Sequence, residues 1–278
     1  MGSYVKTKSG NSLYVEDIHG VQGTIIAAHG LTGTHKQLHY YKEVFGGDYR
    51  FISYDLRGRG NSDPASPNTS IFSHATDLIE LIEELDVENP ILMGYSMGAY
   101  ICALAAANLP RVSSLILLDG AGDADEVSRE LMLQSLNRIA KEYSSTDMYV
   151  DETRRLYKNF NIEWDETIHS ISRYDIQKAQ NGNWQHKSNV SALKKDIESF
   201  YSFNPMETSA SLSCSILLVI ATGSIGDKRS LFTEEMYHRI QHSSSDLHTI
   251  KTRINHYELV FNRQPDDFYQ RIRSFLSP

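Results

Sequence analysis

The hydrophobic pattern of the chain alternates between short apolar runs and longer segments with helical spacing. Unbroken runs of this length are typical of strands buried on both faces of a parallel sheet, and they occupy residues 24–28, 91–93, 114–118 and 216–222. Between them, apolar side chains recur every third or fourth residue, as over residues 71–85, which predicts helices. This alternation predicts an α/β fold with right-handed crossovers between its strands.

Both ends of the chain add elements to this pattern. Residues 4–8 and 12–18 alternate between apolar and polar around a Ser-Gly-Asn turn, which predicts an antiparallel hairpin at one edge of the sheet. Residues 247–254 form a weaker strand pattern, and an amphipathic helix around residues 268–275 follows it. The sheet therefore extends from the first residues to the last part of the chain.

The alternation stops between residues 121 and 213. This region carries two helical patterns, at residues 127–143 and 162–179, many Tyr, Asn and Ser residues, and both tryptophans. We expect a helical cap inserted into a core made of residues 1–120 and 214–278, with the cap lying over the site described next.

The sharpest motif is the turn Gly94-Tyr95-Ser96-Met97-Gly98, which joins the strand at residues 91–93 to a helix over residues 97–108. A strand that turns directly into a helix strains its apex residue and leaves little room beside it, which explains the two glycines. The Ser96 hydroxyl is expected at the N-terminus of the helix, where the Met97 N–H and the helix dipole favour a developing negative charge. Ser96 is therefore the candidate nucleophile.

This strand-turn-helix motif resembles the nucleophile turn of the α/β-hydrolase superfamily. The octapeptide DLRGRGNS, which starts at Asp55, is similar to the D-x-R-G-x-G-x-S loop of cap-bearing members, and His29-Gly30 follows a strand as it does in the family. The resemblance covers nearly the whole chain and is least specific between Gly120 and Ser213. It implies a mostly parallel, doubly wound sheet of about eight strands with an inserted helical cap, in an esterase or C–C bond hydrolase-like branch.

The resemblance also implies a catalytic triad in the chain order serine, acid, histidine. His256 is the expected base because it follows the last strand, although Asn255 stands where the family usually has a glycine. Asp227, in the loop after the strand at residues 216–222, is the expected acid. Asp119, which follows the strand at residues 114–118, is the alternative acid, because some members of the superfamily use that position.

The expected oxyanion hole consists of the backbone N–H groups of Leu31 and Met97. His29 is interpreted as a structural loop residue, because the family's base comes near the C-terminus. Asp55 and Arg57 are expected to hold their own loop through hydrogen bonds and a local ion pair.

Composition narrows the possible partners and cofactors. The net charge of −8 disfavours nucleic acid and anionic lipid, and no apolar run is long enough to cross a bilayer, so we expect a cytoplasmic protein without a membrane partner. Metal-binding spacings and a G-x-G-x-x-G fingerprint are missing from the sequence, which predicts no metal and no cofactor. Cys102 and Cys214 are interpreted as buried reduced thiols.

These features predict a serine hydrolase, carboxylesterase-like, that cleaves a small ester or related carbonyl compound through an acyl-enzyme. Closely similar triads also cleave C–C bonds, lactones and amides, and a ligand-binding or signalling protein of the same fold with slow turnover is a further alternative. An anionic substrate would require a converging cation, and the cap offers five arginines: Arg129, Arg138, Arg154, Arg155 and Arg173. The sequence leaves open which of them face inward, and whether the protein is a monomer or a homodimer.

Overall fold

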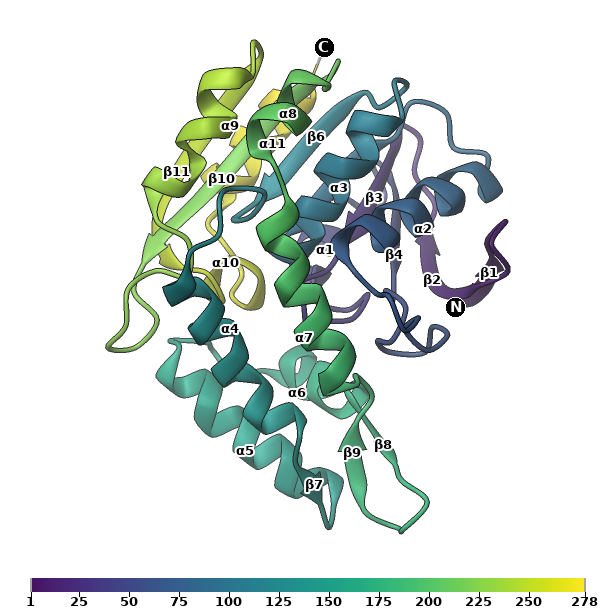
Figure 1. Cartoon of the computed structure of the whole chain (residues 1–278), viewed down its shortest axis with the longest axis vertical. Coiled ribbons are helices and arrows are strands. Elements are labelled where there is room, and N and C mark those ends of the chain that lie inside the picture. The colour runs from purple at the N-terminus through teal and green to yellow at the C-terminus, as the bar shows by residue number, and fades with distance from the viewer. Residues whose placement is uncertain (1, 278) are drawn as a thin grey trace.

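A central eight-stranded sheet organises the computed structural model, which describes residues 2–277 (Figure 1). Its strand order is β1-β2-β4-β3-β5-β6-β10-β11, in which the pairs β1-β2 and β2-β4 are antiparallel and the other pairs are parallel. The strands are β1 (Ser3–Lys6), β2 (Ser12–Ile18), β3 (Thr24–Ala28), β4 (Arg50–Tyr54), β5 (Ile91–Tyr95), β6 (Ser114–Leu118), β10 (Ser215–Gly223) and β11 (Leu247–Asn255). The mostly parallel, doubly wound fold class is confirmed.

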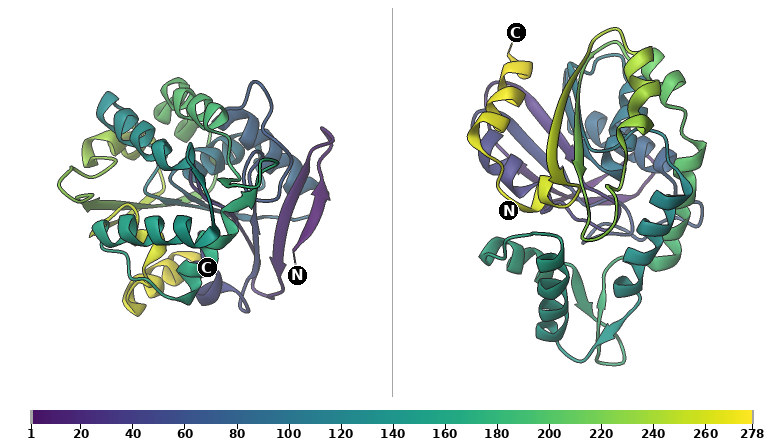
Figure 2. Two further views of the ribbon diagram at one scale, coloured as in Figure 1. Left: turned by 90° about the horizontal axis from the view of Figure 1, so that it is seen from below. Right: turned by 90° about the vertical axis from the view of Figure 1, so that its left-hand side faces the viewer.

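Helices cover both faces of this sheet, as Figure 2 shows. One face packs against α2 (Ile71–Glu84), α3 (Met97–Asn108) and α9 (His238–Ser243), and the other against α1 (His39–Phe45), α10 (Glu258–Phe261) and α11 (Asp266–Leu276). Because side chains alternate along a strand, Leu218 and Ile220 enter the first apolar layer, whereas Leu217 and Val219 enter the second. The unbroken apolar run in β10 is therefore a consequence of two buried faces.

Most of the segment between β6 and β10 lies beyond the carboxyl ends of the parallel strands, whereas its last helix, α8 (Pro205–Ala210), packs beside α3 and α9 of the core (Figures 1 and 2). A small antiparallel sheet of order β7-β9-β8 stands at its far end. Its elements are α4 (Glu126–Ile139), β7 (Glu142–Tyr143), α5 (Thr146–Asn159), α6 (Glu166–Tyr174), β8 (Ile176–Lys178), β9 (Trp184–His186), α7 (Val190–Ser199), the 3-10 turn η1 (Phe200–Ser202) and α8 (Pro205–Ala210). We refer to residues 121–213 as the cap segment.

Two helices end differently from their sequence patterns. The pattern at 162–179 contains α6 only from Glu166, because the Asp165 side chain caps that helix by accepting a hydrogen bond from the Ile168 N–H. The residues after α6 pair with β9 as strand β8. Residues 231–240 also have apolar side chains at helical spacing, but this segment contains the 3-10 turn η2 (Glu234–Tyr237) and the first residues of α9. Within residues 2–277 no helix is both long and apolar enough to span a bilayer.

Strand β5 and helix α3 approach each other so closely that only glycine fits at two positions. A Cβ atom on Gly98 would lie 2.1 Å from the Ala28 carbonyl oxygen of β3, and one on Gly94 would lie 2.2 Å from the Gly98 oxygen. The turn between them holds Ser96 at φ 54° and ψ −119°, a conformation that L residues rarely adopt. Tight packing of three backbones therefore fixes where Ser96 lies.

We predict that Gly98→Ala lowers the free energy of unfolding by about 3 kcal/mol, because the added methyl group clashes with the β3 backbone. Gly182→Ala is the matched control: Gly182 has φ +88° and no atom within 4 Å of its virtual Cβ, so only backbone strain of about 1 kcal/mol is expected. Urea denaturation measures both values. A smaller loss for Gly98→Ala than for Gly182→Ala would contradict the packing argument.

Candidate active site

Ser96 lies at the junction of β5 and α3, close to the end of β6. Its N–H donates a hydrogen bond to the Leu118 carbonyl oxygen at 2.9 Å, which ties the turn to β6. A Cβ on Gly120 would lie 2.3 Å from the Ser96 carbonyl oxygen, so the residues after β6 pass directly beside the turn. The Ser96 residue is only 6% exposed, so a reactant must reach it through the interior of the protein.

His256 lies in the turn after β11, and its imidazole ring packs against the junction of β5 and α3. The ring stacks on Tyr95 with centroids 4.8 Å apart, and the Tyr95 hydroxyl donates to the His256 carbonyl oxygen at 3.0 Å. Because Tyr95 directly precedes Ser96, this stack places the imidazole beside the serine turn. No hydrogen bond joins the Ser96 hydroxyl to His256 within residues 2–277, a looseness that is common in unliganded serine sites.

The partner of His256 is Asp119, and the two side chains are buried. The distance from His256 Nδ1 to Asp119 Oδ2 is 2.6 Å. The other carboxylate oxygen, Oδ1, accepts hydrogen bonds from the Ala221 N–H at 3.0 Å and from the Tyr237 hydroxyl at 2.9 Å. With Nδ1 held by Asp119, the Nε2 atom is the nitrogen left to accept a proton.

Asp227 does not take this position, which corrects the expectation that it is the acid. It lies exposed in the loop after β10, in a turn in which Ile225 and Lys228 exchange backbone hydrogen bonds. Asp119 is favoured because β6 lies between β5 and β10, so the end of β6 reaches both the serine turn and the Ala221 N–H. Chain order did not separate the two acids, since both lie between Ser96 and His256.

The loop after β3 carries the first expected oxyanion donor. A Cβ on Gly30 would lie 3.3 Å from the Ser96 Cβ, so this loop passes the serine at contact distance. Within residues 2–277 neither the Leu31 N–H nor the Met97 N–H donates a hydrogen bond to a protein acceptor outside α3. Both groups are therefore available to bind an anionic oxygen.

His29 is a structural residue of the same loop. Its Nδ1 donates to the Gly30 carbonyl oxygen at 2.7 Å, and its Nε2 accepts from the Leu56 N–H at 3.0 Å. Burial lowers the pKa of His29 to about 3, so the ring is neutral and both nitrogens are occupied. The Gly30 N–H donates to Gln37 Oε1 at 2.8 Å, which fixes the loop from its other side.

Sequence reasoning missed Arg59, a fully buried arginine that connects this loop to the cap segment. Its Nε donates to the Leu31 carbonyl oxygen at 3.1 Å, and its Nη2 lies 2.5 Å from Asp196 Oδ2 of α7. The second Asp196 oxygen accepts from the Thr69 hydroxyl at 2.8 Å. Arg59 was hidden because it occupies a variable position of the D-x-R-G-x-G-x-S pattern.

The two residues of that pattern that were expected to form a local ion pair have other partners. Asp55 accepts from His35 Nδ1 at 2.8 Å and from the Tyr174 hydroxyl of α6 at 2.7 Å. Arg57 pairs instead with Asp77 of α2 at 2.6 Å. Asp55 also accepts from the Asn61 N–H of its own loop at 2.8 Å, so the expected hydrogen bonds within the loop are present, whereas the local ion pair is not. Through Tyr174 the same loop is joined to the cap segment.

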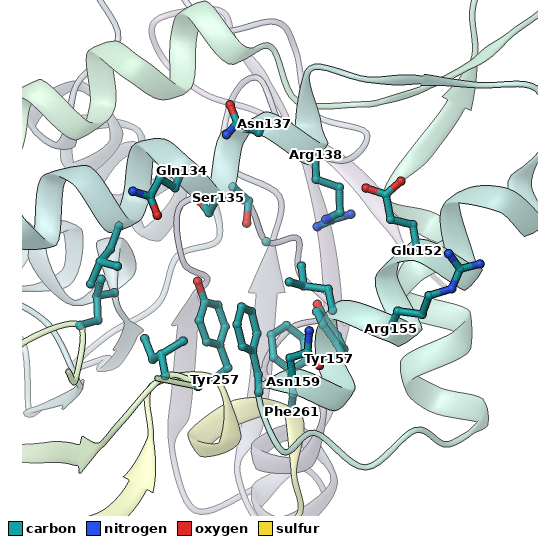
Figure 3. Close-up of a pocket in the computed structure, with 18 of the residues that line it drawn as sticks. Gln134, Ser135, Asn137, Arg138, Glu152, Arg155, Tyr157, Asn159, Tyr257 and Phe261 are labelled. Atoms are coloured by element: carbon teal, nitrogen blue, oxygen red, sulfur yellow. The ribbon is translucent and has the colours of Figure 1, made fainter. Parts of the chain in front are cut away.

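A cavity of about 610 Å³ lies between the cap segment and the core (Figure 3). Thr32, Gly33 and Thr34, which follow Leu31, line one part of it, and Tyr257, which follows His256, lines another. Two aromatic pairs form an apolar wall: Phe160 stacks on Tyr257 at 4.6 Å, and Tyr157 packs on Phe261 at 5.0 Å. The cavity thus reaches both loops of the site, although Ser96 itself is not part of its lining.

Comparison with known proteins agrees with this architecture. A family model described as alpha/beta hydrolase fold matches residues 23–155. The AB hydrolase superfamily protein YisY of Bacillus subtilis is 40% identical over 128 residues, which cover 45% of this chain and 47% of that protein. This match assigns residues 23–155 of the chain to the α/β-hydrolase superfamily. A probable esterase of Oryza sativa subsp. japonica is 30% identical over 107 residues, 37% of this chain and 40% of that protein, so the matched region spans less than half the length of either relative.

Solved structures share the fold over nearly the whole chain. E-2-(acetamidomethylene)succinate hydrolase superimposes with a TM-score of 0.86 at 19% identity and covers 99% of this chain and 98% of that one. An esterase from Exiguobacterium antarcticum gives a TM-score of 0.72 at 17% identity, with 99% of both chains covered. At these identities the likeness establishes the fold alone. Among residues 2–277 no group of three or more His, Cys, Asp or Glu side chains is placed to hold a metal ion.

We predict that Asp196→Ala lowers the free energy of unfolding by about 3–5 kcal/mol, because it leaves the buried Arg59 charge without its partner. Glu198→Ala on the same helix is the control, since Glu198 forms an exposed pair with Arg129 and its loss should cost less than about 1 kcal/mol. Chemical denaturation of both variants measures the difference. Equal losses in the two variants would show that the buried pair does not stabilise the fold.

Proposed function

We propose that this protein is a serine hydrolase that cleaves a small ester or a related carbonyl compound through Ser96, His256 and Asp119. The observation that carries the proposal is the buried His256–Asp119 hydrogen bond beside the strained Ser96 turn. A serine hydroxyl needs a base to become nucleophilic, and the base needs a third group that fixes its tautomer. In this proposal Ser96 is the nucleophile, His256 is the base, and Asp119 is the group that fixes the tautomer of the base.

In the proposed reaction, His256 Nε2 accepts the Ser96 proton while the serine oxygen attacks the substrate carbonyl. The negative charge that develops on the carbonyl oxygen is stabilised by the N–H groups of Leu31 and Met97. His256 then gives the proton to the leaving alcohol, and an acyl-enzyme forms. Water, deprotonated by the same histidine, attacks the acyl group and releases the acid, after which the proton returns to Ser96.

Asp119 supports this cycle because neighbouring groups hold its carboxylate in a fixed position. The Ala221 N–H and the Tyr237 hydroxyl fix one carboxylate oxygen, and the other remains directed at His256 Nδ1. The imidazolium that forms after proton transfer is therefore stabilised without reorientation of the carboxylate.

A second candidate function is ligand binding with slow turnover. It is favoured by the near-complete burial of Ser96, which is 6% exposed. Cleavage of a C–C bond, a lactone or an amide by the same triad stays an alternative, since fold and triad do not determine the scissile bond. Turnover of short esters distinguishes the first candidate from the second.

We predict that Ser96→Ala lowers kcat/KM for p-nitrophenyl acetate and butyrate on the order of 10⁶-fold, because the nucleophile is lost. Steady-state kinetics checks this, and circular dichroism of the variant shows whether the fold is intact. Retained turnover in a folded Ser96→Ala variant would rule out the serine mechanism, whereas negligible turnover by the wild type would favour the ligand-binding candidate.

We predict that Asp119→Asn lowers kcat about 10⁴-fold, because an amide at this position stabilises the wrong histidine tautomer and no longer balances the imidazolium. Asp227→Asn is the matched control at the acid that the sequence analysis favoured, and we expect a loss below about tenfold there. The same ester assay compares the two variants. A larger loss for Asp227→Asn would return the acid role to Asp227.

A further inference from the structure

The cavity between the cap segment and the core contains an arginine whose hydrogen-bonding capacity is only partly used. Arg138, in the last turn of α4, lines this cavity, and its Nη1 donates to the Thr153 hydroxyl of α5 at 3.2 Å. Its guanidinium also lies over the Tyr149 ring, 4.9 Å from the centroid. The remaining edge, formed by Nε and Nη2, donates no hydrogen bond within residues 2–277, and Nε is buried.

The other cap arginines are already engaged or lie elsewhere. Arg129 pairs with Glu198 and Glu126, Arg173 pairs with Asp147, and Arg154 lies over the Trp164 ring. Arg155 also lines the cavity, but it is exposed, and Figure 3 shows its guanidinium beyond Glu152, away from the aromatic wall. Arg138 is therefore the arginine that the structure directs into the interior of the cavity.

The carboxylates of the cavity do not neutralise Arg138 directly. No carboxylate oxygen of residues 2–277 lies within 4.0 Å of its guanidinium nitrogens, and Glu152 is paired with Lys141 at 2.7 Å. Burial raises the pKa of the Asp175 carboxyl to about 7, so this group is partly protonated at neutral pH although Arg138 and Lys187 act to lower its pKa. Arg138 is half-buried, and its buried Nε has no hydrogen-bond partner among residues 2–277. An unpartnered buried donor of a charged group is costly, and a ligand that supplies an anionic acceptor recovers that cost.

The free edge of the guanidinium selects the kind of anion. Nε and Nη2 point the same way and are spaced to donate to the two oxygens of one carboxylate. In Figure 3 Arg138 lies on one side of the cavity, and Tyr157, Phe261 and Tyr257, the residue that follows His256, lie on the opposite side. A ligand in this cavity can thus contact a cation, an apolar aromatic wall and Tyr257, which is the neighbour of His256 in the chain.

We propose that the substrate carries a free carboxylate that binds the Nε and Nη2 edge of Arg138, joined by a short apolar chain to the carbonyl that Ser96 attacks. The substrate class is a monoester, or a related monoacyl derivative, of a small dicarboxylic acid. This inference rests on the proposed hydrolase function, and it makes Arg138 a residue that determines specificity.

The test compares esters of matched length with and without the terminal carboxylate. The mono-p-nitrophenyl esters of succinic, glutaric and adipic acid are paired with p-nitrophenyl butyrate, valerate and caproate, and the ratio of kcat/KM for acid over neutral ester is measured for each pair. We expect the wild type to prefer at least one acid ester about tenfold or more. A wild type that prefers the neutral member of every pair would overturn the inference without any variant.

Three variants locate the origin of that preference. Arg138→Gln should lower the ratio about tenfold to a hundredfold, and Arg138→Lys should retain part of it, because the charge remains while the bidentate edge is lost. Arg173→Gln, which removes an exposed arginine outside the cavity lining, should keep the wild-type ratio. An unchanged ratio in both Arg138 variants would overturn the inference, and a purely structural role of Arg138 would lower both esters equally.

Glutarate binding, measured by isothermal titration calorimetry, separates this inference from the proposed function. Binding to the wild type that is lost in Arg138→Gln supports the carboxylate site even if no ester is turned over, in which case only the hydrolase proposal fails. If the wild type hydrolyses neutral esters, does not bind glutarate and shows no preference for the acid esters, the hydrolase proposal stands and the carboxylate site is rejected.

Discussion

The hydrogen bond between His256 and Asp119 is the interaction on which the proposed site depends. It joins the turn after β11 to the end of β6, and the second oxygen of Asp119 is held by β10 and by Tyr237. Three consecutive strands of the parallel sheet therefore meet at one carboxylate. Because these strands are fixed by two apolar layers, the histidine gains a defined orientation from the core rather than from a flexible loop.

A second polar network connects the cap segment to the oxyanion loop. Arg59 contacts the Leu31 carbonyl oxygen with one nitrogen and Asp196 of α7 with another, and Tyr174 of α6 reaches Asp55 in the same core loop. Movement of α7 would therefore act directly on the residue that carries a proposed oxyanion donor. The segment that shapes the cavity and the loop that would stabilise the transition state are parts of one hydrogen-bonded unit.

The sequence predicted the sheet and the serine turn well because both follow from local patterns. Apolar runs such as residues 216–222 reflect burial on two faces, and the glycines at positions 94 and 98 reflect close backbone contact. The acid was assigned to Asp227 because chain order does not record that β6 lies between β5 and β10. The role of Arg59 depends on Asp196, far along the chain, and that of Arg138 depends on how α4 and α5 meet at the cavity, neither of which a local pattern reveals.

The most direct test of the account is covalent labelling of the protein with a fluorophosphonate, followed by intact-mass analysis and peptide mapping. This reagent reacts with a serine only when a base and an oxyanion hole activate it. The account predicts one adduct per chain, located on Ser96 and formed much more slowly when Asp119 is replaced by Asn. A folded protein that remains unlabelled, or that carries its adduct on another residue, would contradict it.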